Sequence, residues 1–496
     1  MSFCVILRVL RATQKIRRRR QDDARGQTRR QSQMKSQVSR YSFIVLLPWL
    51  FCFAGSTPAA DQVPTSWPAV RHVAQGEDWE MHEGRFHRNG EWVFIKTGKL
   101  LRAFGEAKTA DKVIADIDVL VDRLNFNNFS LNIYPDAFDA DGDGRIDPAR
   151  REAYANIGRM LDHCWKRGVF CSLSFETYNI GGGGTPASFF AQHPEAIAIN
   201  ALGEKARDHE YTVSDGKLTP SVYHPAYHTW SRTFMRNFLS GLGADRCSRL
   251  LFVETTVEPQ YPGACRVGDK DPRRAFLDFN EAAHTAFNHW QKSFPEGDPH
   301  RTQLAWPTTV DERSKLLGHR LFNDFRAWGL AKWVSEDAEA IRSVARDVYI
   351  AVDYNGRFDD KHSMRVGTRD VFLTELKGID IIQIAPHPPV WTTMSWDDVI
   401  AVNRKAGKHW AISEHMSGTG SWGQDDKEMT EILENTLARG TRFGWDLVNA
   451  GNRHATDDYH LYDEHWHSQT LDIIDGDNWP NWLKKIGVKP FVPQPR

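Results

Sequence analysis

Strand-like and helical patterns alternate along most of this 496-residue chain, and this alternation limits the folds it can adopt. The apolar strand-like segments lie at 100–104, 128–133, 169–175, 250–256, 348–352, 379–384, 410–413 and 443–448. Amphipathic helical patterns lie between them, for example at 111–124 and 150–167. A strand, a helix and a second strand form a parallel crossover, so this order predicts a parallel sheet covered by helices.

Eight such units within about 400 residues are typical of a (β/α)8 barrel with inserted loops. A doubly wound sheet is the alternative, but the glycines at 181–184 lead into Thr185 without the lysine of a phosphate-binding loop. Ahead of the barrel, the Asn89-Gly90 dipeptide lies between two strand-like halves, which predicts a β-hairpin. We therefore expect a lead-in and hairpin at 61–95 and the barrel at 96–490.

The N-terminal region has the pattern of a secretory signal peptide. Residues 41–54 are apolar and are followed by small residues up to Ala60. An apolar segment of about 14 residues is too short for a transmembrane helix, which needs about 20. We expect a signal peptide at 34–60, a secreted or periplasmic protein and no membrane contact after cleavage. Residues 1–33 are expected to be a mis-called leader upstream of a true start at Met34, or a disordered basic tail.

The charge of the body disfavours a polyanionic partner. The chain has 63 basic and 64 acidic residues, but residues 1–40 contain 12 of the basic and only two of the acidic ones. Residues 41–60 contain neither, so residues 61–496 have a formal charge of −11. Binding to nucleic acid is therefore not expected. The four cysteines of the body match no metal-site spacing, so we expect free core thiols or one disulfide.

Residues 139–150 match most positions of a calcium-binding loop. The expected oxygen ligands are the side chains of Asp139, Asp141, Asp143 and Asp147 and the carbonyl of Arg145. Position 12 is Arg150 instead of the usual glutamate, so Glu152 or a distant acid would have to replace that ligand. The alternative is an Asp/Gly-rich turn ahead of a helix. We expect a structural Ca²⁺ and no organic cofactor.

Two glutamates follow predicted strands on different sides of the barrel. Glu258 follows the fourth strand and Glu414 follows the seventh. The C-terminal ends of barrel strands meet at one mouth, where enzymes with this fold place their sites. Glycoside cleavage uses such a pair, one carboxylic acid protonating the leaving oxygen and one carboxylate attacking the sugar. Glu254 is the alternative acid, or else an interior carboxylate paired with Lys96 or Arg102.

Polar and aromatic residues at the other strand ends would bind a sugar through hydrogen bonds and ring stacking. The expected substrate-binding residues are Asn132, Glu176, Tyr354, His387, Trp422 and Trp445. Further candidates at these ends are Tyr178, Asp353, His415 and Asp446. So many polar strand ends favour a polar ligand.

Four segments carry a family resemblance: FFAQHPEA at 189–196, SVYHPAY at 221–227, LFNDFR at 321–326 and SEHMSGTGSW at 413–422. They resemble, in the same order, segments of glycoside hydrolase family 42, the β-galactosidase-like group of clan A. The resemblance implies a retaining glycosidase with Glu258 as acid/base, Glu414 as nucleophile and a galactoside as substrate. The family has Asn before the acid/base, where this chain has Val257. A non-catalytic carbohydrate-binding barrel is therefore the alternative function.

Overall fold

The structure is a computed structural model, in which the chain divides into residues 1–62 and residues 63–496. The residues that it describes are 70–74, 77–82, 85–100, 107–178, 184–207, 217–256, 259–261, 271–301, 304–354, 362–384, 396–412, 445–447, 479–485, 487–494 and 496. The predicted leader and signal peptide lie outside these residues. Within the described part, no helix has the length and apolar character that crossing a membrane requires.

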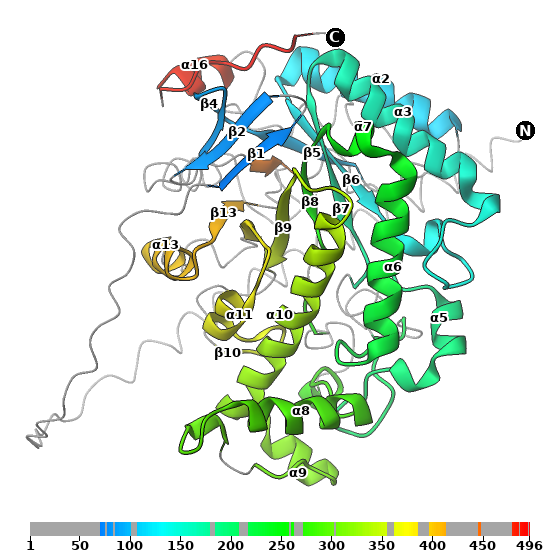
Figure 1. Cartoon of the computed structure of the whole chain (residues 1–496), viewed down its shortest axis with the longest axis vertical. Coiled ribbons are helices and arrows are strands. Elements are labelled where there is room, and N and C mark those ends of the chain that lie inside the picture. The colour runs from blue at the N-terminus through cyan, green and yellow to red at the C-terminus, as the bar shows by residue number, and fades with distance from the viewer. Residues whose placement is uncertain are drawn as a thin grey trace, which may run out of the picture. The chain divides into compact units, whose positions relative to one another are not determined.

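Eight parallel strands close into a barrel, which confirms the predicted (β/α)8 fold (Figure 1). In order around the barrel they are β5 (Lys96–Leu100), β6 (Asn128–Ile133), β7 (Phe170–Phe175), β8 (Leu250–Glu254), β9 (Tyr349–Tyr354), β12 (Ile381–Ile384), β13 (His409–Ile412) and β14 (Trp445–Leu447). The last strand pairs with the first, since Trp445 lies opposite Lys96.

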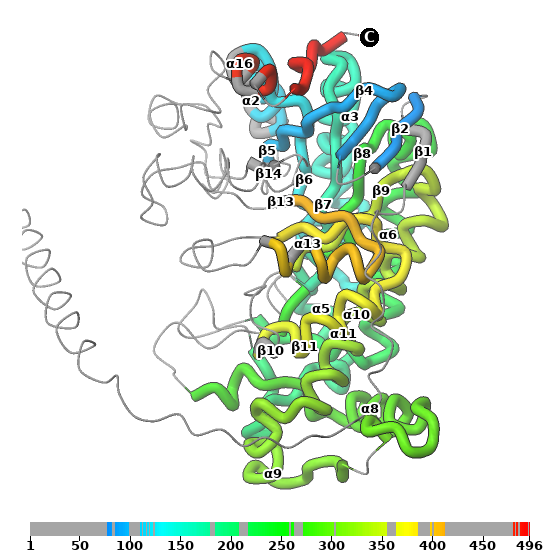
Figure 2. The backbone as a smooth tube through the Cα atoms, turned by 90° about the vertical axis from the view of Figure 1, so that its left-hand side faces the viewer, coloured from blue at the N-terminus to red at the C-terminus, as the bar shows by residue number. Residues whose placement is uncertain are grey.

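Helices follow the strands and cover the outside of the barrel. The main ones are α2 (Ala107–Leu124), α3 (Arg151–Arg167), α6 (Pro225–Leu242), α10 (Arg320–Arg342), α11 (Arg369–Glu375) and α13 (Trp396–Lys405). Figure 2 shows α10, α11 and α13 following one another along one side. Inserted segments add α5 (Ala187–Gln192), α7 (Ala244–Cys247), α8 (Glu281–Ser293), α9 (Val310–Lys315) and the short strands β10 (His362–Ser363) and β11 (Gly367–Thr368).

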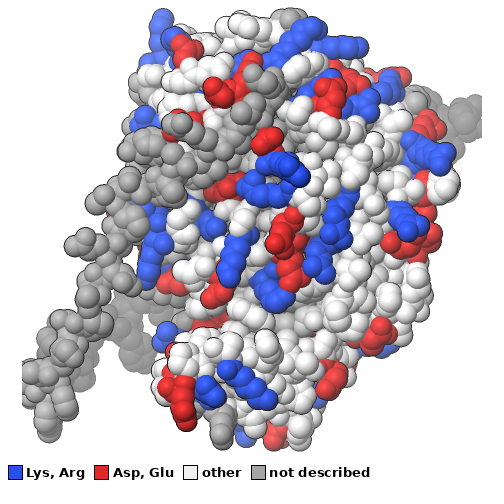
Figure 3. Space-filling view, in the orientation of Figure 1, with Lys and Arg blue, Asp and Glu red and all other residues white. Residues whose placement is uncertain are grey.

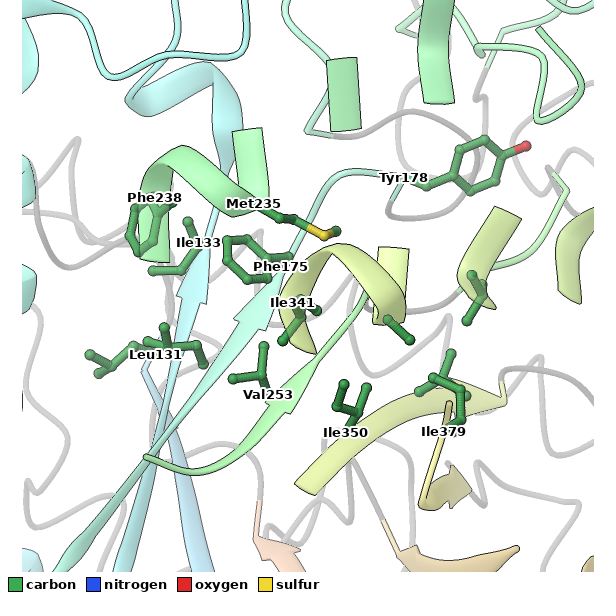
Figure 4. Packing of buried hydrophobic residues seen from close by; sticks show 14 of the residues in the cluster. Leu131, Ile133, Phe175, Tyr178, Met235, Phe238, Val253, Ile341, Ile350 and Ile379 are labelled. Atoms are coloured by element: carbon green, nitrogen blue, oxygen red, sulfur yellow. The ribbon is translucent and has the colours of Figure 1, made fainter. Parts of the chain in front are cut away.

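The outward-facing side chains of the strands form the main core with the helices. Figure 4 shows Phe175 and Val253 of β7 and β8 packed near Met235 of α6 and Ile341 of α10. These side chains are fully buried. Successive residues of a strand point to opposite faces, so the neighbours of these residues face the barrel interior. Each fully buried aliphatic or aromatic side chain stabilises the fold by roughly 1.5–3 kcal/mol.

A four-stranded antiparallel sheet precedes the barrel. It contains β1 (Val70–Ala74), β2 (Glu77–His82), β3 (Arg85–Arg88) and β4 (Glu91–Val93). The predicted hairpin is confirmed, because β3 and β4 are joined by Asn89 and Gly90 with φ angles of 51° and 81°. Two successive positive φ angles are typical of the type I′ turn that matches strand twist.

This sheet packs against the N-terminal end of the barrel. The Trp79 ring lies 4.9 Å from that of Phe170, and the Phe86 ring lies 5.3 Å from that of Tyr349, measured between centroids. Phe170 and Tyr349 are the first residues of β7 and β9 and belong to the same buried cluster as Met81. The C-terminal segment that follows α16 (Trp479–Lys485) adds Phe491 to this cluster.

The first barrel strand lies four residues earlier than the predicted 100–104. The observed strand, Lys96–Leu100, is mostly polar and contains Gly98, which hid it from a search for apolar segments. Thr97 faces the interior and accepts a hydrogen bond from Asn128 Nδ2 at 2.9 Å. Lys96 lies on the outer side, with its Nζ 4.8 Å from the centroid of the Phe126 ring. The polarity of Thr97 thus matches a polar barrel interior, whereas Lys96 packs its charge over an aromatic ring on the outside.

Candidate active site

Several predicted site residues lie outside the part of the chain that the structure describes. They are Glu258, Glu414, His387 and Trp422. Trp445 opens β14, for which only the backbone is described. The structure nevertheless describes residues on both sides of Glu258 and the chain up to two residues before Glu414. β8 ends at Glu254 and the buried residues Gln260 and Tyr261 follow Glu258, while β13 ends two residues before Glu414.

Hydrogen bonds between small polar side chains fill one side of the barrel interior. Ser172 Oγ donates to Asn128 Oδ1 at 3.1 Å, and the hydroxyls of Ser130 and Ser174 lie 2.8 Å apart. All four side chains are buried, and they come from β6 and β7. A polar interior is compatible with burial because each group has a partner.

Asn132 and Glu176, both predicted to bind substrate, lie together at the C-terminal ends of β6 and β7. The Asn132 Nδ2 donates to Glu176 Oε1, and both side chains are almost fully buried. The backbone N–H of Glu176 donates to Ile133 O at 2.8 Å, which continues the ladder one residue past the strand. This pair presents a carboxylate and an amide oxygen, Asn132 Oδ1, at the mouth.

Glu254 is the last residue of β8 and has no exposed surface. It lies opposite Ser174 of β7 and Ala351 of β9, and thus faces the barrel interior. Pairing with Lys96, one predicted explanation for this carboxylate, is wrong because Lys96 lies on the outer side against Phe126. Arg102, the other predicted partner, lies outside the described residues, so Glu254 stays either an alternative acid or an interior carboxylate paired with Arg102.

Tyr354 is not on the interior side of the barrel wall. Its ring packs 5.8 Å from that of Phe372 in α11 and belongs to the outer core with Ile350 and Val352. The alternation that puts these residues outside puts Asp353 inside, opposite Gln383. The prediction that Tyr354 lines the sugar site is corrected accordingly, and Asp353 takes that position.

Several buried polar atoms at the mouth have no hydrogen-bond partner in the described protein. They are Asn132 Oδ1, Gln260 Nε2 and Gln383 Oε1. They lie in or after β6, β8 and β12, so they converge from three strands on one end of the barrel. A buried polar group without a partner destabilises a fold by about 1–3 kcal/mol. Such a cluster fits a site for a ligand rich in hydroxyl groups.

The sequence did not single out Gln260 and Gln383. For Gln383 a signal existed, because it is the one polar residue in the apolar segment Ile381–Ile384 and alternation points it inward. For Gln260 the sequence shows only that it follows Glu258 closely. Its burial results from inserted segments whose packing no local pattern predicts.

The inserted segments around α8 and α9 form a second packed layer beside the mouth. Phe276, Phe287 and Phe322 are fully buried in it. Arg326 of α10 is also fully buried and donates to Leu277 O at 2.7 Å, while its guanidinium lies 4.3 Å from the Tyr261 ring centroid. Burial lowers the pKa of this guanidinium. Arg326 thus joins the inserted layer to the segment that follows Glu258.

The predicted calcium loop brings three carboxylates together. Ligand oxygens of Asp139, Asp141 and Asp143 all lie within 4.8 Å of one another. Asp139 is buried and accepts from the N–H groups of Gly142 and Gly144 and, at 2.8 Å, from Trp230 Nε1. Burial raises the pKa of Asp139 to about 6, although these hydrogen bonds act in the opposite direction.

The other predicted ligands of the loop take part in hydrogen bonds within it. Asp147 Oδ2 accepts from the N–H of Ala140 at 2.7 Å, and Arg145 donates its N–H to Asp143 Oδ1 at 2.8 Å. Arg150 precedes α3 and offers no acidic side chain at position 12. Three converging carboxylates fit Ca²⁺, which prefers oxygen ligands, and the missing twelfth ligand leaves part of the shell to carbonyls or water.

Searches with the sequence alone found no match to any family model or curated protein. Solved structures with similar folds include an exo-β-1,4-mannosidase from Opitutaceae bacterium strain TAV5, with 13% identity, 82% of this chain and 61% of that one covered, and a TM-score of 0.46. A β-galactosidase from Bacillus circulans sp. alkalophilus has 12% identity, 74% and 52% coverage and a TM-score of 0.49. Gan42B, a GH42 β-galactosidase, has 14% identity, 80% and 57% coverage and a TM-score of 0.49.

These proteins all cleave glycosides by name, and one belongs to the family that the sequence motifs resemble. This chain spans only about half to three fifths of the length of each of them. At such identities and TM-scores the likeness adds nothing to the argument for activity. The barrel assignment rests on the strand pairing, and the functional argument rests on the residues of the mouth.

Proposed function

We propose that this protein is an exported retaining glycoside hydrolase that cleaves an oligo- or polysaccharide. The observation that carries the proposal is the convergence, on the C-terminal end of a closed barrel, of buried polar atoms from three strands that have no hydrogen-bond partner among the described residues. Hydrogen-bonding groups aimed into one concave end are what a polyhydroxylated ligand requires. Enzymes with this fold place their chemistry at this end.

The two proposed catalytic groups are Glu414 and Glu258. Glu414 attacks the anomeric carbon while Glu258 gives its proton to the leaving oxygen, so the glycosidic bond breaks and a glycosyl ester forms on Glu414. Glu258, now ionised, takes a proton from water, whose oxygen attacks the same carbon and releases Glu414. Two inversions at one carbon retain the anomeric configuration. Glu254 is the alternative proton donor.

The barrel supports this pairing through its strand order. Glu258 follows β8 and Glu414 follows β13, with β9 and β12 between them in the ring. Chain segments that leave the barrel at these two strands start on different sides of one mouth. Asn132, Glu176 and Asp353 then lie at the ends of the neighbouring strands, where they would bind sugar hydroxyls.

A neutral glycan is the substrate class that the charges favour. Figure 3 shows basic and acidic side chains interspersed over the visible face. Many of them are paired, such as Arg342 with Asp380 and Arg369 with Asp398, both at 2.6 Å. Mixed and paired charges give a polyanionic glycan no extended basic surface there. A galactoside is what the family resemblance implies, and the alternative function is a non-catalytic carbohydrate-binding barrel.

The first test replaces the candidate glutamates Glu414, Glu258 and Glu254 one at a time. Glu414→Gln should lower turnover by about 10⁴-fold or more on every substrate, because no nucleophile remains. Glu258→Gln should do so on natural glycans but much less on 4-nitrophenyl glycosides, whose leaving group departs without protonation. The matched control is Glu339→Gln on α10, which should retain full activity.

Proton NMR of the first product should show retention of the anomeric configuration. If Glu254→Gln instead of Glu258→Gln gives the leaving-group dependence, Glu254 is the acid. If the wild-type protein binds an oligosaccharide in calorimetry and releases no reducing ends from pH 4 to pH 8, the protein is a binding barrel and the proposed hydrolysis is wrong.

We also propose that the loop at 139–147 binds a structural Ca²⁺ through Asp139, Asp141 and Asp143. The support is the convergence of their oxygens and the oxygen preference of this cation. When bound, Ca²⁺ would neutralise carboxylate repulsion and stiffen the loop after β6. The loop also contacts a helix of the barrel, because Asn237 Nδ2 of α6 donates to Gly144 O at 2.8 Å.

A further inference from the structure

Gln260 lies two residues after the proposed acid Glu258 and has no exposed surface. Its side-chain oxygen, Oε1, accepts a hydrogen bond from Arg365 Nη1 at 3.1 Å. A guanidinium can only donate, so the oxygen of the amide must face Arg365. The NH₂ group of Gln260 is consequently directed away from Arg365.

The residue after Gln260, Tyr261, is held by several hydrogen bonds. The N–H of Tyr261 donates to Arg365 O at 2.7 Å, and the Tyr261 hydroxyl donates to Arg326 O at 3.1 Å. The hydroxyl of Tyr223 lies 3.1 Å from that of Tyr261. These contacts hold Tyr261, and with it the neighbouring backbone of Gln260, in place.

The NH₂ group itself has no acceptor in the described protein. Gln260 Nε2 is a buried donor without a hydrogen-bond partner. Buried polar groups are nearly always paired, and an unpaired donor destabilises the fold. Val257 has no polar side chain, so Gln260 is the amide nearest to Glu258 in the sequence. A buried donor that lacks a partner among the described residues, two positions after the proposed acid in the sequence, is best explained by a bound acceptor.

We propose that the side-chain NH₂ of Gln260 donates a hydrogen bond to a hydroxyl oxygen of the carbohydrate bound at the barrel mouth. The inference rests on the proposed function and assigns a substrate-binding residue to it. Arg365 acts as a positioning residue, because it orients the amide through Oε1 without contacting the sugar.

The substitution Gln260→Met tests the donor, since it keeps the length of the side chain and removes both polar atoms. The kcat/KM on 4-nitrophenyl β-D-galactopyranoside or β-D-mannopyranoside should fall about tenfold, the value of one neutral hydrogen bond. The midpoint of thermal unfolding should stay unchanged or rise, because an unsatisfied donor is removed. The control is Gln291→Met on α8, half-buried outside the barrel, which should leave kcat/KM unchanged.

A second variant separates donation to substrate from anchoring by Arg365. Gln260→Glu keeps an acceptor for Arg365 but loses the NH₂ donor, so it should lose as much kcat/KM as Gln260→Met. If Gln260→Glu has wild-type kcat/KM and Gln260→Met unfolds at a lower temperature, Gln260 is only an anchor and the inference is wrong.

Binding measurements distinguish this inference from the proposed hydrolysis. If wild type cleaves no glycoside but binds D-galactose, D-mannose or cellobiose in calorimetry, and Gln260→Met weakens that binding, the inference stands and hydrolysis fails. If wild type cleaves glycosides and Gln260→Met cleaves them equally well, hydrolysis stands and the inference fails. If wild type neither binds nor cleaves any of these sugars, both are overturned.

Discussion

Asp278 is a carboxylate that the fold buries completely beside the mouth. Burial raises its pKa from 3.8 to about 6, although the N–H groups of Ile199 and Asn280 donate to Oδ1 at 2.9 and 3.0 Å and partly offset this effect. The folded protein therefore binds the proton of Asp278 more tightly than the unfolded chain does. Such a group reduces the free energy of unfolding as pH rises from 3.8 to about 6.

Replacing Asp278 with Asn should stabilise the protein in a pH-dependent manner. The amide keeps an oxygen for both backbone donors and cannot ionise. Relative to wild type, the gain in unfolding free energy should be near zero at pH 4 and reach about 3 kcal/mol above pH 6.5. Chemical denaturation across this pH range measures it, with the exposed Asp397→Asn as control. A constant gain at every pH would contradict the raised pKa.

The positions of the candidate site residues were predictable where the chemistry and the strand alternation agreed. Asn132 and Glu176 end adjacent strands, and the structure brings them into contact. Tyr354 was misplaced because a polar hydroxyl suggested the mouth, whereas the aromatic ring fills a gap against Phe372. Gln260 could not be found from the sequence, since its burial depends on residues far along the chain, such as Arg365.

At the scale of elements, the helices and strands were predictable wherever their ends carry local signals. The helix α3 ends at Gly168, whose φ of 69° suits glycine, and the predicted 150–167 differs from it by one residue. The helix α8 begins at Glu281, although the helical pattern of the sequence extends back to residue 274. Its cap is Asn280, whose side chain accepts from Ala283 N, while residues 272–274 form a separate short turn.

The proposed calcium loop at 139–147, which connects β6 to α3, predicts that the thermal stability of the protein depends on Ca²⁺. Removing Ca²⁺ with EGTA should lower the midpoint of thermal unfolding by several degrees, because bound cation stabilises the folded state by mass action. Adding back Ca²⁺, but not Mg²⁺, should restore it. Kinetic constants measured well below that midpoint should change little, since the proposed chemistry uses no metal.

Asp141→Asn combined with Asp143→Asn should abolish the effect of EGTA, whereas Asp311→Asn on α9 should leave it intact. An unfolding temperature that is the same with EGTA and with Ca²⁺ would show that the loop is only the Asp/Gly-rich turn held by Asp139. The hydrogen bonds that Asp139 accepts from Gly142, Gly144 and Trp230 would then suffice to shape it.

At the scale of the barrel, the two ends have different chemistry. The N-terminal end is filled by apolar side chains of the β1–β4 sheet, including Trp79 and Met81. The C-terminal end carries buried polar atoms that lack hydrogen-bond partners in the part of the chain that the structure describes, such as Gln383 Oε1. The apolar end supplies stability that offsets the destabilising groups at the polar end. Mutations at the N-terminal end should therefore lower the free energy of unfolding without changing activity, and mutations at the C-terminal end should lower activity.

Met81→Ala tests this separation. Met81 is fully buried between the sheet and the barrel, so truncation should lower the free energy of unfolding by about 2–5 kcal/mol through lost burial and a cavity. The kcat and KM should stay at wild-type values at temperatures where the variant is folded, because the substitution is at the opposite end from the mouth. The control Glu80→Ala, on the other face of β2, should destabilise much less.

Denaturation and steady-state kinetics on the same preparation provide both readouts. A sheet that merely covers the barrel would unfold in a separate, earlier transition, and the main transition of Met81→Ala would match wild type. A lower kcat in fully folded Met81→Ala would show that the N-terminal end also affects activity, which would contradict the proposed separation of stability from function. We expect a single unfolding transition at lower stability, with unchanged kcat and KM, because the β1–β4 sheet and the barrel share one core. The contact between the Phe86 and Tyr349 rings indicates this shared core.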